Sequence, residues 1–224
     1  MARSGAQQQL ATAGSVIRSR PRAISIPEAE RGQGQQGRLG WVAEARAVDV
    51  IVLAFSADPI ARWIYPNPDQ YLSRFPAFVR GFGGRAFEHG TAYATAEMEG
   101  AALWLPPGVH SDDQALESLI QKTVVEPTRS ELFAVLEQMD GYHPKEDHWY
   151  LPLIGVDPAR QGGGFGAALM SHALAPCDRG STLAYLESSN PANITLYERH
   201  GFELLGEIRV GGSPPVFPML RRPR

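Results

Sequence analysis

Residues Trp149 to Leu174 read WYLPLIGVDPARQGGGFGAALMSHAL, an apolar strand pattern that runs into a glycine-rich loop and then into a helix pattern. The glycines of the loop leave backbone N–H groups open to a ligand, because no side chain covers them. The helix that follows directs the partial positive charge of its N-terminus at the same place. The segment therefore predicts an anion site that suits a phosphate or pyrophosphate group.

Two nucleotide-binding motifs compete for this loop. A Walker loop is excluded, since the segment lacks the Gly-Lys-Ser/Thr ending that would hold a γ-phosphate and magnesium. A dinucleotide fingerprint fits better, because Gly162, Gly164 and Ala167 match G-x-G-x-x-A and Glu187 follows twenty residues later. Only 37 residues follow Glu187, however, too few for the remaining strands of a doubly wound sheet. A nicotinamide-dependent oxidoreductase is kept as a weak hypothesis.

The segment 156–166 resembles the acetyl-coenzyme A signature of the GNAT N-acetyltransferases. Gln161, Gly164 and Gly166 stand at the positions of its Q-x-x-G-x-G/A motif. A second block resembles the same family at the expected distance; it consists of Asn193, Tyr197, Glu198, Arg199, Gly201, Phe202 and Glu203. Together the two blocks cover about the last third of the chain. The segments 54–59 and 102–108 are similar, more loosely, to a bacterial and fungal branch of the family.

The resemblance implies an α+β fold with a mixed, mostly antiparallel central sheet that is flanked by helices. In this fold the fourth and fifth strands splay apart and leave a V-shaped wedge. The apolar run 149–156 suits the fourth strand, because it is apolar on both faces. Pro152 within it cannot donate to a strand ladder, so we expect it at a bulge or an unpaired edge. The sheet should part at this residue.

The resemblance also implies where acetyl-coenzyme A binds as co-substrate. Backbone groups near Gly155 and Val156 would hold the thioester arm, and Asn193 would bond to a pantetheine amide. The expected co-substrate-binding residues are Gly155, Val156, Gln161, Gly162, Gly163, Gly164, Phe165, Gly166, Ala167 and Asn193. The family often has Lys or Arg where this chain has Gly163. Arg160 either supplies the missing contact or is solvated.

Tyr197 is implied, by the same resemblance, to protonate the departing thiolate. It follows Asn193 by four residues, so the two share a helix face, although this spacing also suits packing on the sheet. Glu187, at the end of an expected strand 182–187, is the first candidate for the general base, and His148 is the second. A chain of water molecules is a further possibility. The histidines fit no chelating pattern: His143 and His148 lie five apart in an expected loop and are interpreted as surface residues, so we expect no metal.

Three functions follow from these observations. The first is an N-acetyltransferase that moves the acetyl group of acetyl-coenzyme A directly to a primary amine of a small molecule or peptide. The second is a non-catalytic acyl-coenzyme A sensor on the same fold, and the third is the oxidoreductase above. Tyr197 favours the first over the second.

Composition limits the alternatives. The chain has 224 residues, 43% of them hydrophobic and 20% charged, which suits one domain over residues 39–224. No apolar run approaches the ~20 residues of a membrane span, and the net charge of -3 gives no basic field for nucleic acid. The single Cys177 cannot form an internal disulfide. We expect a cytoplasmic monomer or homodimer without membrane or nucleic-acid partners.

Residues 1–38 are expected to form a disordered arm. The first 27 contain no acidic residue, and arginine and serine are interleaved there, so an organelle transit peptide is the alternative. After the arm, apolar spacing predicts a helix over 41–55, and aromatic residues follow in short helical pieces interrupted by prolines. A hairpin is expected from strands 91–97 and 101–105. Ser111 and Thr128 are expected to cap two further helices.

Overall fold

The computed structural model describes residues 21–26 and 35–224, with side chains from residue 43 onward in the second range. Its strands are β1 (Ala23–Ser25), β2 (Ala92–Thr95), β3 (Gly100–Leu105), β4 (His148–Val156), β5 (Leu183–Ser188), β6 (Glu203–Leu204) and β7 (Phe217–Arg221). Its α-helices are α1 (Gln35–Ala54), α2 (Pro59–Ile64), α3 (Pro68–Gly83), α4 (Arg85–Glu88), α5 (Asp113–Thr123), α6 (Thr128–Tyr142), α7 (Phe165–Arg179) and α8 (Ile194–Arg199). Two short 3₁₀ turns, η1 (Pro158–Arg160) and η2 (Pro191–Asn193), precede α7 and α8.

The strands form one sheet in the order β1-β2-β3-β4-β5-β7-β6. Only the β4–β5 pair is parallel among the described strands, and α7 connects those two strands. The remaining pairs are antiparallel. The predicted α+β fold with a mixed, mostly antiparallel sheet is therefore confirmed.

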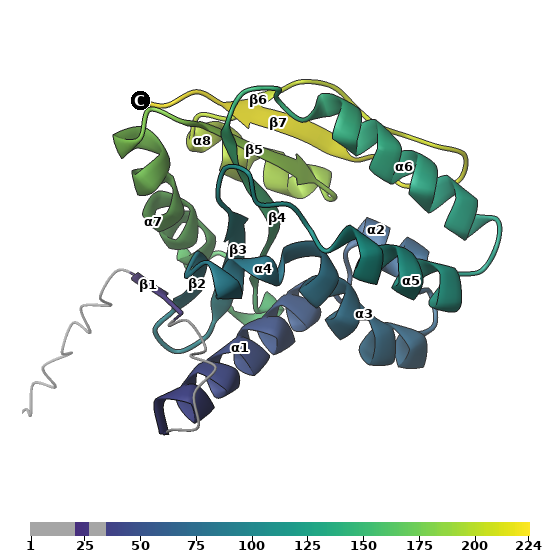
Figure 1. Ribbon diagram of the computed structural model, residues 1–224, viewed down its shortest axis with the longest axis horizontal. Coiled ribbons are helices and arrows are strands. Elements are labelled where there is room, and N and C mark those ends of the chain that lie inside the picture. Colours follow the sequence, from purple (N-terminus) through teal and green to yellow (C-terminus); the bar gives the residue numbers. More distant parts are fainter. Residues whose placement is uncertain (1–20, 27–34) are drawn as a thin grey trace, which may run out of the picture.

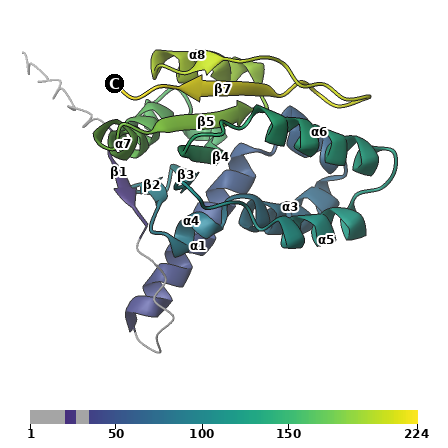
Figure 2. The ribbon, with the colours of Figure 1, turned by 45° about the horizontal axis from the view of Figure 1, so that its top comes forward.

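Helices cover both faces of the sheet, because neighbouring residues of a strand point to opposite sides. Leu103 belongs to the core formed with α1, α3 and α5, whereas the adjacent Trp104 belongs to the core formed with α7. Figure 1 shows α7 along one side of the sheet and α1, α3 and α5 on the other, and Figure 2 shows β5 and β7 lying between α8 and the helices α3 and α5. The central strands are therefore buried on both faces, as the apolar run in β4 predicts.

The sheet parts at Pro152. β4 pairs with β5 only from His148 to Leu151, while its pairing with β3 continues to Val156. Between two β3–β4 pairs, the single residue Trp104 faces two residues of β4, Leu151 and Pro152, so Pro152 lies in a β-bulge. Proline has no backbone N–H to donate to β5, and the two strands diverge from this point. Both the predicted bulge and the predicted wedge are confirmed.

Several helix ends differ from the sequence predictions. Asp112, not Ser111, caps α5 by accepting from the backbone N–H of Ala115, and the hydroxyl of Ser111 donates to the carbonyl of Phe82. At α6, Thr128 is the first helical residue, and Glu126 accepts from the N–H of Ser130 instead. Proline also fails to interrupt helices at two positions, since Pro76 lies inside α3 and Pro176 inside α7. The presence of α5 and α6 was thus predicted correctly and their N-caps were not, while the expected interruption at Pro76 is wrong.

The predicted disordered arm, residues 1–38, is wrong for two short stretches. Ala23–Ser25 form strand β1, which pairs with β2 at the edge of the sheet, and the side chains of Ala23 and Ile26 are buried. Residues 35–38 are already part of α1. Residues 1–20 and 27–34, with most of the suggested transit peptide, lie outside the described residues. Within the described part of the chain, no helix has the length and apolar character needed to cross a membrane.

Candidate active site

The loop before α7 is held open by two glycines with positive φ. Gly162 has φ +77° and Gly164, the N-cap of α7, has φ +84°, a region that side chains with a Cβ atom rarely adopt. In this conformation the N-terminus of the 15-residue helix α7 faces the loop. The first N–H groups of a helix have no partner within it. The loop and the helix end therefore present backbone donors to one place, as an anion site requires.

Nine of the ten expected co-substrate-binding residues line a single cavity beside this loop, which we call the loop cavity. They are Gly155, Val156, Gln161, Gly162, Gly164, Phe165, Gly166, Ala167 and Asn193. Gly163 is the exception: a Cβ atom there would lie 2.8 Å from the Phe165 ring, and its N–H points to the carbonyl of Arg160. Gly163 is thus a residue of loop packing and does not line the loop cavity.

Two residues that line the loop cavity, Gly155 and Gln161, also have structural roles. A Cβ atom at Gly155 would lie 2.7 Å from the Cβ of Ala54, so glycine lets α1 approach β4 closely. The side-chain amide of Gln161 donates to the carbonyl of Val156 at 3.3 Å, which ties the loop to the end of β4. The edge of β4 beyond Leu151 faces the wedge without a strand partner. Backbone groups on this edge are therefore open to a ligand.

Arginines mark the loop cavity as the positive end of the site. Arg160 and Arg199 both line it. The Arg160 guanidinium lies 3.5 Å from the Glu99 carboxylate and 5.7 Å from the centre of the Phe165 ring. It is half exposed and shares its charge with Glu99, so a bound anion would have to compete with that ion pair.

A second cavity, the wedge cavity, lies where β4 and β5 diverge. Its walls come from α2, α3, α6, β4, β5 and α8, and most of its lining is apolar. Among the described residues that line it, the charged ones are Asp58 and Glu187, both carboxylates. Each oxygen of Asp58 accepts one hydrogen bond, Oδ1 from the N–H of Ala61 and Oδ2 from the hydroxyl of Ser189 at 2.6 Å. Burial raises the pKa of Asp58 despite these bonds.

The two cavities meet at Tyr197 and Asn193, which line both. Asn193 ends η2 and Tyr197 lies one turn later in α8, so the expected common face is confirmed. The Tyr197 side chain is 5% exposed, and burial, followed by the charge of Asp58, raises its pKa. The phenol is therefore protonated at neutral pH and able to donate. It also contacts Phe202, so packing and donation are compatible roles.

Glu187 lies in β5 just beyond the last β4–β5 pair, at the wall of the wedge cavity. Its side chain is 3% exposed, and its Oε1 lies 3.3 Å from Nε2 of His143. Burial, and then the Glu187 carboxylate, raise the pKa of the neighbouring Tyr150 and Tyr185. His148, the second candidate base, does not line the wedge cavity and is connected to it through His143.

Two residues of this site were not identified from the sequence. His143 was interpreted as a surface residue, and no local pattern links it to Glu187, which lies far along the chain. Asp58 stands before Pro59, which is a helix-cap signal that the structure bears out, since Asp58 caps α2. This signal explains why an aspartate is present but does not reveal that its carboxylate also reaches Ser189 and borders two cavities.

Known proteins resemble the chain in both sequence and structure. Residues 130–204 match the family model described as an acetyltransferase (GNAT) domain. An uncharacterized N-acetyltransferase of Schizosaccharomyces pombe, C550.08, is 27% identical over 195 residues, which are 80% of this chain and 79% of the relative. A crystal structure described as histone acetyltransferase HPA2 and related acetyltransferase, from Corynebacterium glutamicum, is 26% identical with a TM-score of 0.60, over 92% of this chain and 98% of that one.

The chain carries a GNAT acetyltransferase domain. Arylalkylamine N-acetyltransferase 2 of Aedes aegypti has the same fold, with a TM-score of 0.61 at 12% identity over 92% of this chain and all of that one. The GNAT protein is accordingly an acyltransferase, and enzymes of this family use acetyl-coenzyme A. The oxidoreductase hypothesis is thereby excluded.

Proposed function

We propose that this GNAT enzyme transfers the acetyl group of acetyl-coenzyme A directly to the primary amine of a small molecule. The observation that carries the proposal is the meeting of two oppositely charged cavities. The loop cavity offers arginines and backbone N–H groups, whereas the wedge cavity offers the Glu187 carboxylate in apolar surroundings. An anionic donor at one end and a cationic amine at the other would meet at Tyr197.

The described residues fit acetyl-coenzyme A. Its pyrophosphate suits the N–H groups of the loop 161–166, where positive φ at Gly162 and Gly164 keeps side chains out. Its pantetheine arm suits the unpaired edge of β4 beyond Leu151, since its amides can bond there as a strand would. When bound, acetyl-coenzyme A supplies an activated acetyl carbonyl. Everything else in the reaction is positioning and proton transfer by the protein.

Glu187 acts in this proposal as the general base. The acceptor enters as an ammonium ion, which must lose a proton before its nitrogen can attack. The Glu187 carboxylate is nine-tenths buried, borders the wedge cavity and has no competing cation from Lys or Arg among the residues described there. Tyr197 donates the proton that the departing sulfur takes up, and its raised pKa keeps that proton available.

The lining of the wedge cavity favours a small acceptor with an apolar body. Phe55, Phe75, Phe78 and Phe82 line it; along α3 the Phe78 ring stacks on Phe75 and contacts Phe82 at a tilt. An aromatic or branched alkyl amine would bury its carbon skeleton against these rings. Each oxygen of Asp58 already accepts one hydrogen bond and burial raises its pKa, so Asp58 is a weaker partner than Glu187 for a second positive charge on the acceptor. The mosquito relative of the same fold is, by its name, an arylalkylamine acetyltransferase.

The test is a panel of amines incubated with the enzyme and acetyl-coenzyme A, with thiol release and acetylated product both measured. We expect N-acetylation of monoamines such as phenethylamine and isoamylamine, and much slower reaction with agmatine or with a lysine peptide. Tight binding of acetyl-coenzyme A without transfer to any amine would contradict the proposal and favour an acyl-coenzyme A sensor. Efficient transfer to the peptide would place the acceptor outside the wedge cavity.

A further inference from the structure

Glu187 is the first of three side chains that lie in close contact one after another. Its Oε1 lies 3.3 Å from Nε2 of His143, and Nδ1 of His143 lies 3.0 Å from Nε2 of His148. Nδ1 of His148 lies 2.8 Å from the backbone carbonyl oxygen of Glu146. The path starts at the wall of the wedge cavity and ends at the start of β4, where His148 is only partly buried.

The chemistry of the last acceptor fixes the protons along the whole path. The Glu146 carbonyl can only accept, so His148 must carry its proton on Nδ1. Burial lowers the pKa of His148, which keeps it neutral at pH 7 and leaves Nε2 as an acceptor. His143 must then donate from Nδ1, and its Nε2 faces a carboxylate. Nε2 of His143 and Oε1 of Glu187 face each other without a hydrogen bond, because neither a bare nitrogen nor a carboxylate can donate, and one added proton would join them.

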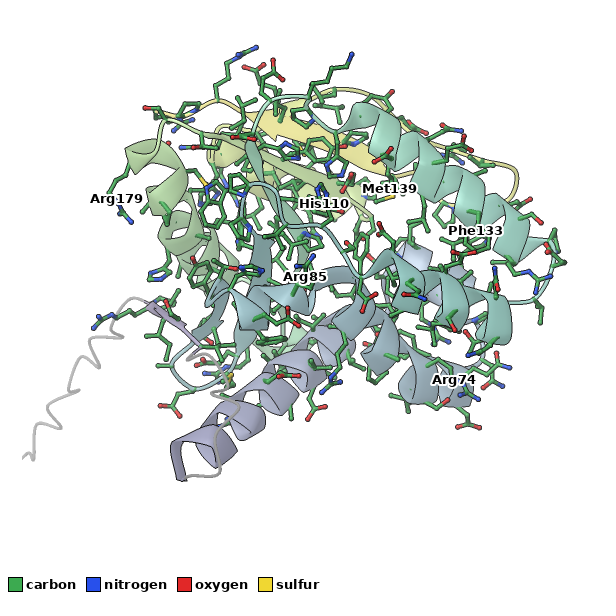
Figure 3. The ribbon with its side chains drawn as sticks, viewed as in Figure 1. Arg74, Arg85, His110, Phe133, Met139 and Arg179 are labelled. Atoms are coloured by element: carbon green, nitrogen blue, oxygen red, sulfur yellow. The ribbon has the colours of Figure 1, made fainter. Side chains whose placement is uncertain are left out.

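His143 stands between two cavities. It lines a cavity bounded by α5 and α6, the α5–α6 cavity, while its partner Glu187 lines the wedge cavity. His110, Phe133 and Met139, labelled in Figure 3, also line the α5–α6 cavity, from the loop after β3 and from α6. The His143 ring is held against Tyr150 at 4.7 Å and Tyr185 at 4.4 Å between ring centres. The His143 ring is therefore fixed in orientation and connects the mostly apolar wedge cavity to the more polar α5–α6 cavity.

We propose that His143 relays protons for the general base. It receives the proton that Glu187 takes up and passes a proton on toward His148 and the α5–α6 cavity. The proposal rests on the proposed function. The N–H bond of the ammonium ion breaks as an O–H bond forms on Glu187, and the same proton then passes to Nε2 of His143, which restores the Glu187 carboxylate. The Nδ1 proton of His143 passes to Nε2 of His148, and His148 releases one proton to water. One proton leaves for each amine acetylated, and no electrons change hands.

The surroundings of the path decide its response to pH. The titratable groups that face it from the neighbouring elements are His110, Asp140, Tyr142, Glu146, Tyr150 and Tyr185. Burial, His143 and His110 lower the pKa of His148, whereas the Glu146 carbonyl and Glu187 raise it, and the net shift is downward. His148 therefore accepts a proton from His143 at pH 7. Because its pKa lies below the ordinary value of about 6.5, His148 becomes protonated only at pH values below 6.5, and the path then closes.

The first experiment compares His143→Gln with His110→Gln, which makes the same change in the same cavity without touching Glu187. We expect turnover of His143→Gln to fall by at least about tenfold, with unchanged affinity for acetyl-coenzyme A, and the loss of activity below pH 6.5 to disappear. His110→Gln should stay within about twofold of the wild type. Added imidazole should restore turnover to His143→Ala, since a small base can occupy the space and move the proton.

Each contrary result has a distinct meaning. A wild type that acetylates no amine would contradict the proposed function together with the relay. A second result would contradict the relay alone and leave His143 a packing residue. In this case the wild type is active, His143→Gln lowers turnover by the same factor at every pH, and imidazole does not rescue His143→Ala. Nitrogen-15 NMR of the histidine rings tests the path without any substrate. We expect the Nδ1–H form of His148 and a proton on Nδ1 of His143, and a bare Nδ1 on His143 would overturn the proposal.

Discussion

The loop cavity and the wedge cavity adjoin each other but are assembled in different ways. Most of the loop cavity comes from one continuous segment, 154–167, whose glycines fix the backbone conformation. The wedge cavity instead collects Asp58, Glu187 and Tyr197 from separate elements, and these residues meet only after the sheet has formed. In the proposed function, the loop cavity binds acetyl-coenzyme A through backbone groups and the wedge cavity acts through side chains. Changes in the loop should therefore affect binding, and changes in the wedge should affect turnover.

The largest effect is expected from Gly164→Asp, because a carboxylate would enter the anion site. Two like charges about 4 Å apart repel by roughly 4 kcal/mol at an intermediate dielectric, which corresponds to about 10³-fold in affinity. Calorimetric titration with acetyl-coenzyme A measures the change. Gly108→Asp is the matched control, since Gly108 also has a positive φ, +76°, and lies outside the loop cavity. Equal affinities of the two variants would show that the loop does not bind the pyrophosphate.

Tyr197→Phe should lower turnover by about 10²-fold while the affinity for acetyl-coenzyme A stays nearly constant. The change removes the buried hydroxyl but keeps the ring against Phe202. Tyr65→Phe is a suitable control, because it removes another part-buried hydroxyl, bonded to Thr123, away from both cavities. Single-turnover kinetics at saturating acetyl-coenzyme A separate the two. Wild-type turnover of Tyr197→Phe would make solvent the proton donor.

Removal of residues 1–26 should have the smallest effect on the site and a measurable one on stability. The deletion takes away β1 and the buried side chains of Ala23 and Ile26. Burial of one large aliphatic side chain contributes about 2 kcal/mol, so we expect the melting temperature to fall by roughly 4 to 8 °C. Turnover at a temperature where the variant is folded should stay within about twofold. An unchanged melting temperature would show that β1 does not contribute to the sheet in solution.

The features that could be predicted from the sequence are those encoded by neighbouring residues. Pro152 in an apolar run predicted both the bulge and the wedge, because proline lacks a backbone N–H and disturbs strand pairing at its own position. The residues of the glycine loop other than Gly163, and the Asn193–Tyr197 pair, likewise line the loop cavity. β1 was missed because three residues carry no periodicity, and it forms only because β2 offers an unpaired edge.

The side-chain network of the wedge could not be predicted in this way. Glu187 and His148 were named as alternative bases, and the structure connects them through His143, which was interpreted as a surface residue. Tertiary folding brings the loop after α6 against β5, and no spacing in the sequence records that contact. The same holds for Ser189 and Asp58, which lie 131 residues apart in the sequence and whose side chains hydrogen-bond at 2.6 Å.

The most direct test of acetyl transfer by the wedge cavity is the single-turnover rate of Glu187→Gln, followed as a function of acetyl-coenzyme A concentration with an amine that the wild type acetylates. Glutamine keeps the size of the side chain and removes its ability to take up a proton. We predict that the maximal rate falls by about 10³-fold, while the concentration that gives half the maximal rate is unchanged. A maximal rate within a few-fold of the wild type would contradict the assignment of Glu187 as the base.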